Sequence, residues 1–259
     1  MFFYGESDTG LVRRENQDSY VFSEIKTDCF LAAVFDGMGG LSFGSLASSL
    51  AKESLVEYLS EAMKNREPSH IGDSEMKDLL SDAVAYASHI LYTRSLKAPE
   101  HESMGTTLAA ILATSKKAYV FHVGDSRVYA LISGKFHRLT KDHTLVQYLI
   151  DTKQINAHEA ENHPQKHVLI KAIGTEDFVS PDISVIHLSK VKHFLICSDG
   201  LTIHVSDDEI ESVIKEKSSE KEKVSRLISL TKERGAYDNT TVIALSPSDT
   251  KTHLRKERS

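Results

Sequence analysis

Two long apolar runs in this sequence each end abruptly at an aspartate followed by glycine. They cover Ala32–Asp36 and Phe194–Asp199. Such runs predict buried strands, so each carboxylate would lie where rigid scaffold meets an open loop. Asp125 and Asp238 occupy two further turns beside apolar strands. Four aspartates placed in this way predict a carboxylate cluster, and such clusters usually hold hard cations.

These aspartates could also be simple turn formers, because Asp-Gly and Asp-Asn pairs favour turns by bonding to their own backbone. That interpretation suits any one of them better than all four, since three of the four close strongly apolar strands. The cluster interpretation predicts a Mg²⁺ or Mn²⁺ site, in which two ions sharing one carboxylate can generate a hydroxide near neutral pH. The histidines form no His-x-x-x-His pattern and the cysteines no Cys-x-x-Cys pattern, so a zinc site is not expected.

Composition excludes several classes of protein. A chain of 259 residues with 40% hydrophobic and 26% charged residues can bury a large core. The net charge of -6 does not indicate a nucleic-acid binder. No apolar run is long enough to span a bilayer, and the N-terminus does not read as a signal peptide. Because Cys29 and Cys197 both lie in apolar runs, we expect reduced core cysteines and a cytoplasmic protein.

The pattern of predicted elements indicates the fold class. Strands occur in groups and helices in pairs, unlike the strict alternation of a parallel doubly wound fold. Stacked antiparallel sheets with a helix pair on each outer face fit this order, which gives an α+β, four-layer αββα sandwich. One domain over residues 1–246, followed by a polar tail over 247–259, is expected. The predicted strands lie within 1–36 and at 106–113, 118–123, 127–132, 135–139, 183–188, 193–197 and 240–245. Three helices are predicted at 44–63, 73–94 and 145–153. A fourth helix is predicted to begin after the capping box at Ser206, and a fifth to include Val224–Ile228.

Several phosphate and hydrolase chemistries lack their motifs. No glycine-rich dinucleotide pattern, P-loop or Gly-x-Ser-x-Gly elbow is present. A cysteine phosphatase would need an arginine just after its cysteine, and neither Cys29 nor Cys197 has one. Arg13 lies in the loop before Asn16-Gln17-Asp18 and could be a solvated surface residue. Beside a metal cluster, however, an arginine is well suited to bind a phosphate through two hydrogen bonds.

Seven short motifs together resemble one family. In order, they are Gly10-x-x-Arg13-x-x-Asn16-Gln17-Asp18, Asp36-Gly37-Met38-Gly39-Gly40, Gly105-Thr106-Thr107, Gly124-Asp125-Ser126-Arg127, Asp142-His143-Thr144, Ser198-Asp199-Gly200 and Asp238-Asn239-Thr240-Thr241. The set is similar to the metal-dependent, PP2C-type serine/threonine protein phosphatases, in particular their compact bacterial branch. The motifs keep the family's order and span about residues 5–245.

The resemblance implies the same sandwich fold and a role for each matching residue. It implies that Asp36 bridges two Mn²⁺ or Mg²⁺ ions and that segment 145–179 is a variable flap beside the site. The resemblance also implies that the Gly37 carbonyl, Asp199 and Asp238 ligate these ions, and that Asp125 with Asp199 holds a third, weaker ion. It implies phosphate binding by Arg13. Gln17 and Asp18 would lie near the second metal, outside its ligand shell.

Two residues depart from patterns within the family. Met38 stands where eukaryotic members carry a histidine proposed as a general acid, so leaving-group protonation must come from water or another group. Gln17 replaces a glutamate that many members have, which removes one negative partner from the second metal's water shell. Bacterial members often tolerate both changes.

The sequence therefore predicts hydrolysis of phosphoserine and phosphothreonine in proteins by direct attack of a metal-bridging hydroxide. The catalytic carboxylates would be Asp36, Asp199 and Asp238. The expected partners are phosphoproteins made by an opposing serine/threonine kinase, without nucleic acid or membrane, and the expected state is a monomer. Alternatives are a dedicated switch-type phosphatase for one phosphoserine regulator, a non-catalytic phosphoprotein-binding module, and a metal-dependent nuclease or small-molecule phosphoesterase.

Overall fold

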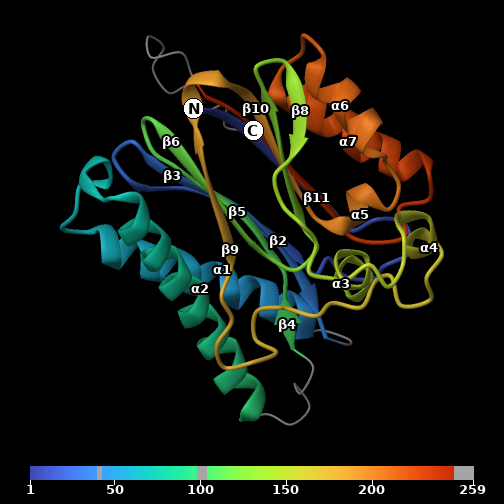
Figure 1. Cartoon of the computed structure of the whole chain (residues 1–259), viewed down its shortest axis with the longest axis horizontal. Coiled ribbons are helices and arrows are strands. Elements are labelled where there is room, and N and C mark those ends of the chain that lie inside the picture. Colours follow the sequence, from blue (N-terminus) through green and yellow to red (C-terminus); the bar gives the residue numbers. More distant parts are fainter. Residues whose placement is uncertain (40–42, 98–103, 248–259) are drawn as a thin grey trace.

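The computed structural model describes residues 1–39, 43–97 and 104–247. Within these residues, two antiparallel sheets stack face to face, and helices cover both outer faces (Figure 1). The predicted four-layer α+β sandwich is thus confirmed. The predicted tail lies outside the described residues apart from Pro247, as does Gly40 of the second motif. In the described part of the chain, no helix has the length and apolar character needed to cross a membrane.

Each sheet is antiparallel throughout and combines strands that are distant in sequence. In spatial order, the first sheet consists of β1 (Phe2–Asp8), β11 (Thr240–Ser246), β10 (Val191–Cys197), β7 (Arg127–Ile132) and β8 (Lys135–Arg138). The second consists of β2 (Asp18–Lys26), β3 (Cys29–Met38), β5 (Leu108–Ala113), β6 (Lys117–Val123) and β9 (Asp182–His187), with the short β4 (Gly105–Thr106) paired to the end of β3.

The continuous apolar runs arise because the central strands are buried on both faces. Along β3, Leu31, Ala33 and Phe35 face the helices, whereas Ala32 and Val34 face the other sheet. Successive side chains of a strand point to opposite faces, so a strand between two cores needs apolar residues at every position. Strand β10 is divided in the same way between the sheet–sheet core and the second helix layer.

Two helix pairs form the outer layers. Helices α1 (Phe43–Met63) and α2 (Asp73–Leu96) cover the second sheet, and α6 (Asp207–Lys215) and α7 (Glu220–Glu233) cover the first. The capping box predicted at Ser206 is present: its hydroxyl accepts from the Glu209 N–H, and Glu209 accepts from the Ser206 N–H. Both cysteines are buried and free, as expected.

Three segments differ from the sequence prediction. The predicted strand over 106–113 is interrupted at Thr107, because that residue turns its polar groups toward Asp36. The polar stretch after residue 156 contains a short helix, α4 (Ala157–Glu161), begun by a capping box at Asn156. Another short helix, α5 (Asp199–Thr202), follows β10 directly and begins at the aspartate.

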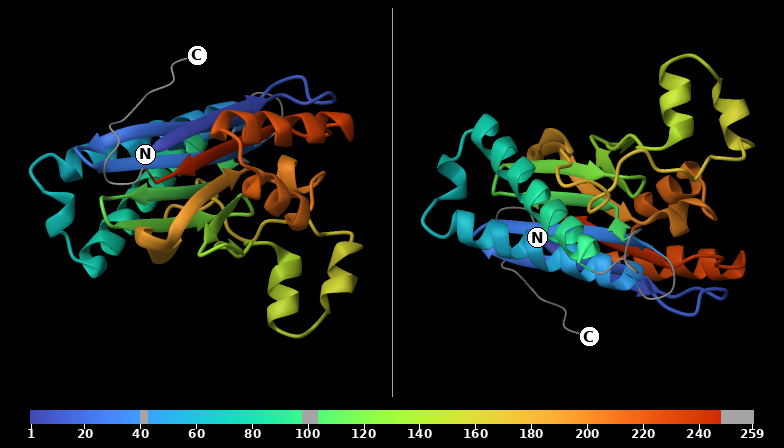
Figure 2. Two further views of the ribbon diagram at one scale, coloured as in Figure 1. Left: turned by 90° about the horizontal axis from the view of Figure 1, so that it is seen from above. Right: turned by 90° about the horizontal axis from the view of Figure 1, so that it is seen from below.

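The predicted flap begins with α3 (Leu145–Asp151) and α4, which project away from the two sheets (Figure 2). A narrow neck joins these helices to the body. There the Leu145 N–H donates to the Val168 carbonyl at 2.8 Å, and the Ile170 N–H donates to the His143 carbonyl at 2.9 Å. Backbone hydrogen bonds thus fix both ends of the outer flap, residues 145–168, where it meets the sandwich.

Candidate active site

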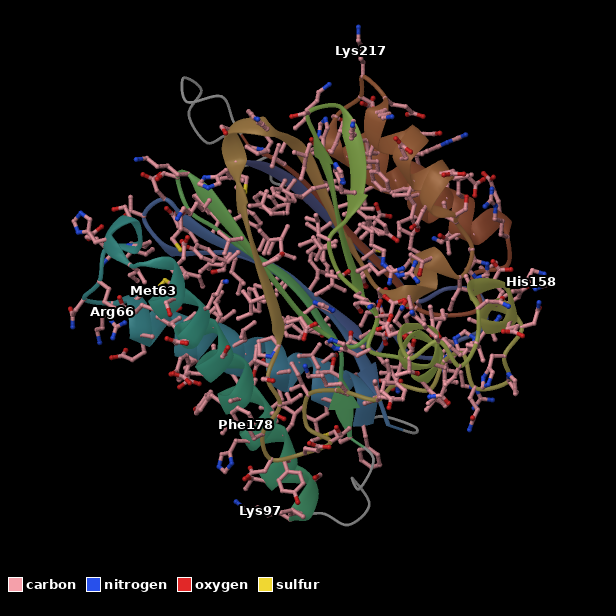
Figure 3. The ribbon with its side chains drawn as sticks, viewed as in Figure 1. Met63, Arg66, Lys97, His158, Phe178 and Lys217 are labelled. Carbon is pink, nitrogen blue, oxygen red and sulfur yellow. The ribbon has the colours of Figure 1, made fainter. Side chains whose placement is uncertain are left out.

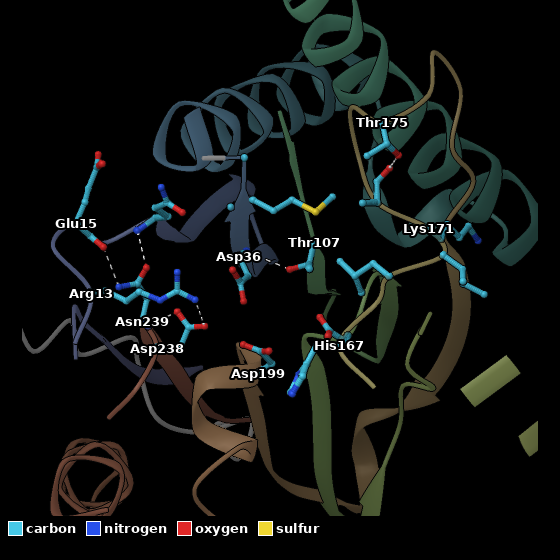
Figure 4. A pocket seen from close by; sticks show the side chains of 18 of the residues that line it. Arg13, Glu15, Asp36, Thr107, His167, Lys171, Thr175, Asp199, Asp238 and Asn239 are labelled. Carbon is cyan, nitrogen blue, oxygen red and sulfur yellow. Dashed lines mark hydrogen bonds and ion pairs between the residues drawn. The ribbon is translucent and has the colours of Figure 1, made fainter. Parts of the chain in front are cut away.

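The ends of four strands meet at one edge of the sandwich and bring the predicted aspartates together. Asp36, at the end of β3, is paired with Asp18 at the start of β2. In the other sheet, the end of β10 lies beside the start of β11, where the Ser198 N–H donates to the Thr241 carbonyl. Pairing within each sheet and contact between the two sheets, where Ser198 and Thr241 donate to Asp18, therefore collect motifs separated by about two hundred residues. Asp36, Asp125, Asp199 and Asp238 line a single pocket (Figure 4).

Glycines allow the backbone segments around these aspartates to approach closely. A Cβ on Gly37 would lie 2.0 Å from the Gly44 carbonyl oxygen, and one on Gly200 would lie 2.0 Å from the Asn239 carbonyl oxygen. Real Cβ atoms do not approach oxygen so closely, so both positions require glycine. The Asp-Gly pairs noted in the sequence are thus explained by packing next to the carboxylates.

Thr107 fixes the backbone of Asp36 through both of its polar groups. The Asp36 N–H donates to the Thr107 hydroxyl at 3.1 Å, and the Thr107 N–H donates to the Asp36 carbonyl at 2.9 Å. The same hydroxyl lies 2.6 Å from that of Ser126. Sequence reasoning placed Thr107 in a motif but gave it no role. It positions the central aspartate.

Asp18 lies buried directly behind the pocket. One of its carboxylate oxygens accepts hydrogen bonds from Ser198 and Thr241, each at 2.7 Å. The other oxygen is buried and has no hydrogen-bond partner among the described residues. Burial raises the pKa of Asp18 to about 7, against the opposing effect of those two hydrogen bonds. A buried carboxylate with an unpaired oxygen fits a place beside a cation.

The aspartates facing the pocket are buried close together, which disfavours their charged forms. Burial raises the pKa of Asp36 well above its usual range, and the nearby charges of Asp18 and Asp199 raise it further. Burial likewise raises the pKa of Asp199, and it raises that of Asp125 to about 8. One oxygen of Asp199 is also buried without a partner in the described part of the chain. Oxygen ligands gathered in this way suit hard divalent cations, so the donor set fits Mg²⁺ or Mn²⁺.

Asn239 connects the arginine loop to this cluster. Its side-chain amide donates to the carbonyls of Thr9 and Glu15 and accepts from the Gln17 N–H, all within 3.0 Å. The loop that carries Arg13 is thereby held against the turn at Asp238. Arg13 donates to the Asp238 carboxylate at 2.7 Å, while half of its side chain stays exposed. The remaining guanidinium N–H groups are available to a phosphate.

The pocket has a volume of about 730 Å³ and is walled on one side by the flap. Flap residues 167 and 169–172 line it, together with Thr175. Figure 4 shows His167 next to Asp199, across the pocket from Arg13. Sequence reasoning did not identify His167, because nothing in its local pattern marks it. Met38, which the sequence singled out, also lines the pocket.

A second group of ligand-type side chains lies outside this pocket. Ligand atoms of His122, His143 and Asp182 lie within 4.8 Å of one another. Nδ1 of His143 accepts from the Gly124 N–H at 3.1 Å, which leaves the proton of the neutral ring on Nε2, 3.5 Å from Asp182. Burial lowers the pKa of His143 to about 4, so the ring is neutral. The His122 ring stacks on that of His143 and donates a hydrogen bond to the Lys141 carbonyl, so these side chains lie where β6, the neck and β9 meet.

Comparison with known proteins places this geometry in a family. A family model described as Protein phosphatase 2C matches residues 12–237. The serine/threonine phosphatase stp of Listeria welshimeri is 33% identical over 237 residues, which is 92% of each chain. The crystal structure of the serine/threonine phosphatase Stp1 from Staphylococcus aureus has a TM-score of 0.84 at 29% identity and covers 95% of each chain.

A further structure contains metal. It is the catalytic domain of the serine threonine protein phosphatase PstP in complex with two manganese ions. It has a TM-score of 0.78 at 33% identity and covers 94% of this chain and 96% of its own. The matched segment includes the residues from Arg13 to Tyr237 and thus nearly every part of the pocket. From fold, site and sequence alike, the chain belongs to the protein phosphatase 2C family.

Proposed function

We propose that this protein removes phosphate from phosphoserine and phosphothreonine in other proteins and depends on Mn²⁺ or Mg²⁺. The observation that carries this is the meeting of three pocket-facing aspartates, Asp36, Asp199 and Asp238, beside the guanidinium of Arg13. Carboxylates that can hold divalent cations and an arginine that can hold a phosphate are the parts that metal-assisted phosphate hydrolysis needs.

Asp36, Asp199, Asp238 and the Gly37 carbonyl would hold two ions in the pocket, with Asp36 between them. Asp125 would contribute to a third, and Asp18 would support the group from behind without ligating. When bound, the ions supply an activated water as nucleophile and neutralise charge on the phosphate. The buried unpaired oxygens of Asp18 and Asp199 support this assignment. So does the manganese of the similar PstP structure.

Arg13 would bind the equatorial oxygens of the substrate phosphate. Its Nη2 contacts Asp238 at 2.7 Å, so the guanidinium plane is oriented by a residue at the metal site. Orientation of this kind is what reduces the entropic cost of holding a phosphate for in-line attack. Arg13 lies on the pocket rim, outside the expected ion ligands, so its loss would weaken substrate binding more than it would disturb the ions.

The rim beside Arg13 suits a protein substrate. Leu11, Val12 and Tyr237 are all more than 60% exposed, and the Leu11 N–H donates to the Ala236 carbonyl, which joins their two loops. Exposed apolar side chains next to a polar pocket are typical of protein-binding surfaces. We further propose that residues 1–246 form the catalytic unit and that it acts as a monomer. It would act in the cytoplasm, opposite a serine/threonine kinase.

The decisive experiment is hydrolysis of a phosphothreonine peptide in EDTA, Mg²⁺ or Mn²⁺ by the wild type, Asp199→Ala and Arg13→Ala. We expect activity only with metal, a loss of at least about 10³-fold for Asp199→Ala, and a KM about tenfold higher for Arg13→Ala. Undiminished metal-dependent activity of Asp199→Ala would overturn the site assignment. Absence of activity from folded wild type with every metal would favour a binding module.

A further inference from the structure

His167 approaches the pocket from the flap and lies opposite the arginine side. It lines the pocket, and its imidazole lies beside Asp199 in Figure 4. The flap helices themselves point elsewhere: His158 on α4 lies at the periphery of the molecule (Figure 3). Of the pocket-lining residues in the described part of the chain, His167 is the one histidine.

The position of His167 is set by the neck of the flap. It ends a turn that follows Pro164, in which the Lys166 N–H donates to the His163 carbonyl at 3.1 Å. The next residue, Val168, accepts the neck hydrogen bond from Leu145. His167 therefore stands one residue from a hydrogen-bonded anchor, and the outer helices do not determine where its side chain lies. The neck therefore places the backbone of His167 beside the pocket, which its exposed side chain lines.

The imidazole has no fixed task within the protein. The structure gives its ring no hydrogen bond or ion pair among the residues described, and the side chain is exposed to the pocket. Burial and the nearby charge of Asp238 raise the pKa of Asp199, and a charge on the adjacent His167 ring would act in the opposite direction. The ring thus lies close to the pocket floor, which is formed by Asp36, Asp125, Asp199 and Asp238 with Asp18 behind them. Its nitrogens stay available to a bound substrate.

The proposed reaction needs a proton at this side of the pocket. Attack on phosphorus comes in line with the leaving oxygen, so a nucleophile at the aspartate floor directs that oxygen toward the opening. The oxygen of serine or threonine leaves as a strongly basic alkoxide unless it is protonated as the bond breaks. The proton must therefore come from water or from a side chain at the opening, on the flap side or the rim.

Several other side chains around the opening are poorly suited to this task. The guanidinium of Arg13 does not give up its proton in proteins. Lys171 is engaged with Asp182 at 3.3 Å, and Glu15 accepts the Ser45 hydroxyl at 2.6 Å. The thioether of Met38 carries no proton. An imidazole, by contrast, exchanges a proton readily near neutral pH.

We propose that His167 donates the proton to the leaving serine or threonine oxygen, a role that rests on the proposed phosphatase function. The attacking water oxygen bonds to phosphorus, and the bond from phosphorus to the side-chain oxygen breaks with its electron pair on that oxygen. The imidazolium N–H proton moves to this oxygen and completes the hydroxyl. The proton lost by the attacking water passes to solvent, and solvent reprotonates the ring.

Two substrates with different leaving groups test this role in the metal-loaded enzyme. A phosphothreonine peptide needs a proton on its leaving oxygen, whereas p-nitrophenyl phosphate releases a stable phenolate without one. For His167→Ala we expect kcat on the peptide to fall about 100-fold and kcat on p-nitrophenyl phosphate to change less than about threefold. His158→Ala, an exposed histidine on the same flap, is the matched control and should leave both rates unchanged.

The conservative variant separates proton donation from simple contact. His167→Gln can donate a hydrogen bond but cannot transfer a proton, so it should be as slow as His167→Ala on the peptide. An equal loss on both substrates, no loss on the peptide, or recovery by glutamine would each overturn the proposal. A wild type that hydrolyses neither substrate with Mn²⁺ would instead refute the proposed function, and the role of His167 with it.

Discussion

The floor of the pocket and its flap are built in opposite ways. The floor aspartates stand at or next to the ends of core strands. Hydrogen bonds with Thr107 hold the backbone of Asp36, and hydrogen bonds from Ser198 and Thr241 hold the carboxylate of Asp18. The flap helix α3 has no buried residue, and α4 buries only Ala160. A few backbone hydrogen bonds at the neck join the outer flap to the body.

The difference matches the two tasks proposed for the pocket: the floor aspartates would hold the ions, and the flap would contact the substrate. Asp36 lies in β3 and Asp199 directly follows β10, two strands buried on both faces, so the backbone that carries these carboxylates is as stable as the fold. The flap has few buried contacts and can open locally at a small cost in free energy. Firmly held carboxylates beside a wall with few buried contacts suit the proposed combination of an ion site and a protein substrate. Four predictions test the contrast, from the largest expected effect to the smallest.

Asp36→Asn should have the largest effect on turnover and little harmful effect on folding. The substitution removes the carboxylate expected between two ions, so metal-dependent activity should fall at least about 10³-fold. It also removes one charge from a buried group whose like charges repel, so the melting temperature in EDTA should rise or stay unchanged. Peptide hydrolysis and thermal unfolding of the same preparation check both parts. A destabilised Asp36→Asn in EDTA would contradict the account of the floor.

Asp142→Ala should destabilise the protein at the junction between floor and flap. Asp142 accepts hydrogen bonds from Arg127 at 2.8 and 3.1 Å and pairs with Arg138, and its side chain is only 12% exposed. Removing it deprives two largely buried arginines of their nearest carboxylate and leaves Arg127 only a 3.6 Å ion pair with Asp207, which should cost roughly 2–4 kcal/mol of unfolding free energy. Urea unfolding measures this cost. The exposed pair of Lys64 and Glu61 is the control, since Glu61→Ala should cost less than about 0.5 kcal/mol.

The floor should make the stability of the metal-free protein depend on pH. The folded pKa values of Asp18 and Asp125, about 7 and about 8, lie above those of an unfolded aspartate. The folded state therefore binds more protons, and stability is greatest below the unfolded pKa and is lost as pH rises through 7 and 8. In EDTA the melting temperature should fall by at least about 3 °C between pH 5.5 and pH 8.5.

Two comparisons decide whether the floor causes that trend. Saturating Mn²⁺ should reduce or reverse it, because cations bind the ionised carboxylates. Asp18→Asn should flatten it in EDTA, since one of the responsible groups is gone. An identical slope in the wild type and in Asp18→Asn would assign the trend to other groups.

Tyr148→Ala should have the smallest effect. Tyr148 lies on α3 with 49% of its surface exposed, so truncation should change unfolding free energy by less than about 0.5 kcal/mol. Tyr129, in the core of the first sheet, is fully buried and donates to Asp207 at 2.7 Å. The same substitution there should cost roughly 3–5 kcal/mol. Urea unfolding of both variants tests whether the flap is energetically independent; similar costs would refute the contrast.

Much of the fold could be predicted from local patterns. The apolar runs predicted β3 and β10 because a strand buried on both faces needs an apolar residue at every position. Helical spacing predicted α1 and α2, and the capping box predicted the start of α6. The polar stretch after residue 156 was harder to predict, because a helix as short as α4 leaves too few apolar positions to show a period.

The candidate site was less predictable from local patterns than the fold. The aspartates that end apolar strands were identifiable from the residues alone, because the strand and the carboxylate are neighbours in the chain. The loop position of Arg13 beside the predicted cluster suggested phosphate binding, and the resemblance to a family added to it, whereas a role for Asp18 came only with that resemblance, since a buried strand residue has no local signature. Their assigned roles stay predictions until the variants are measured.

The sequence by itself determined the strands, the helix pairs and the aspartates placed at the strand ends, since each depends on residues within one element. Only the tertiary structure decided that Thr107 holds Asp36 and that His167 faces Asp199. It also joined His122, His143 and Asp182, which the chain separates by up to sixty residues. Periodicity and capping are local properties of a chain, whereas these contacts depend on how sheets pair and where the flap neck closes.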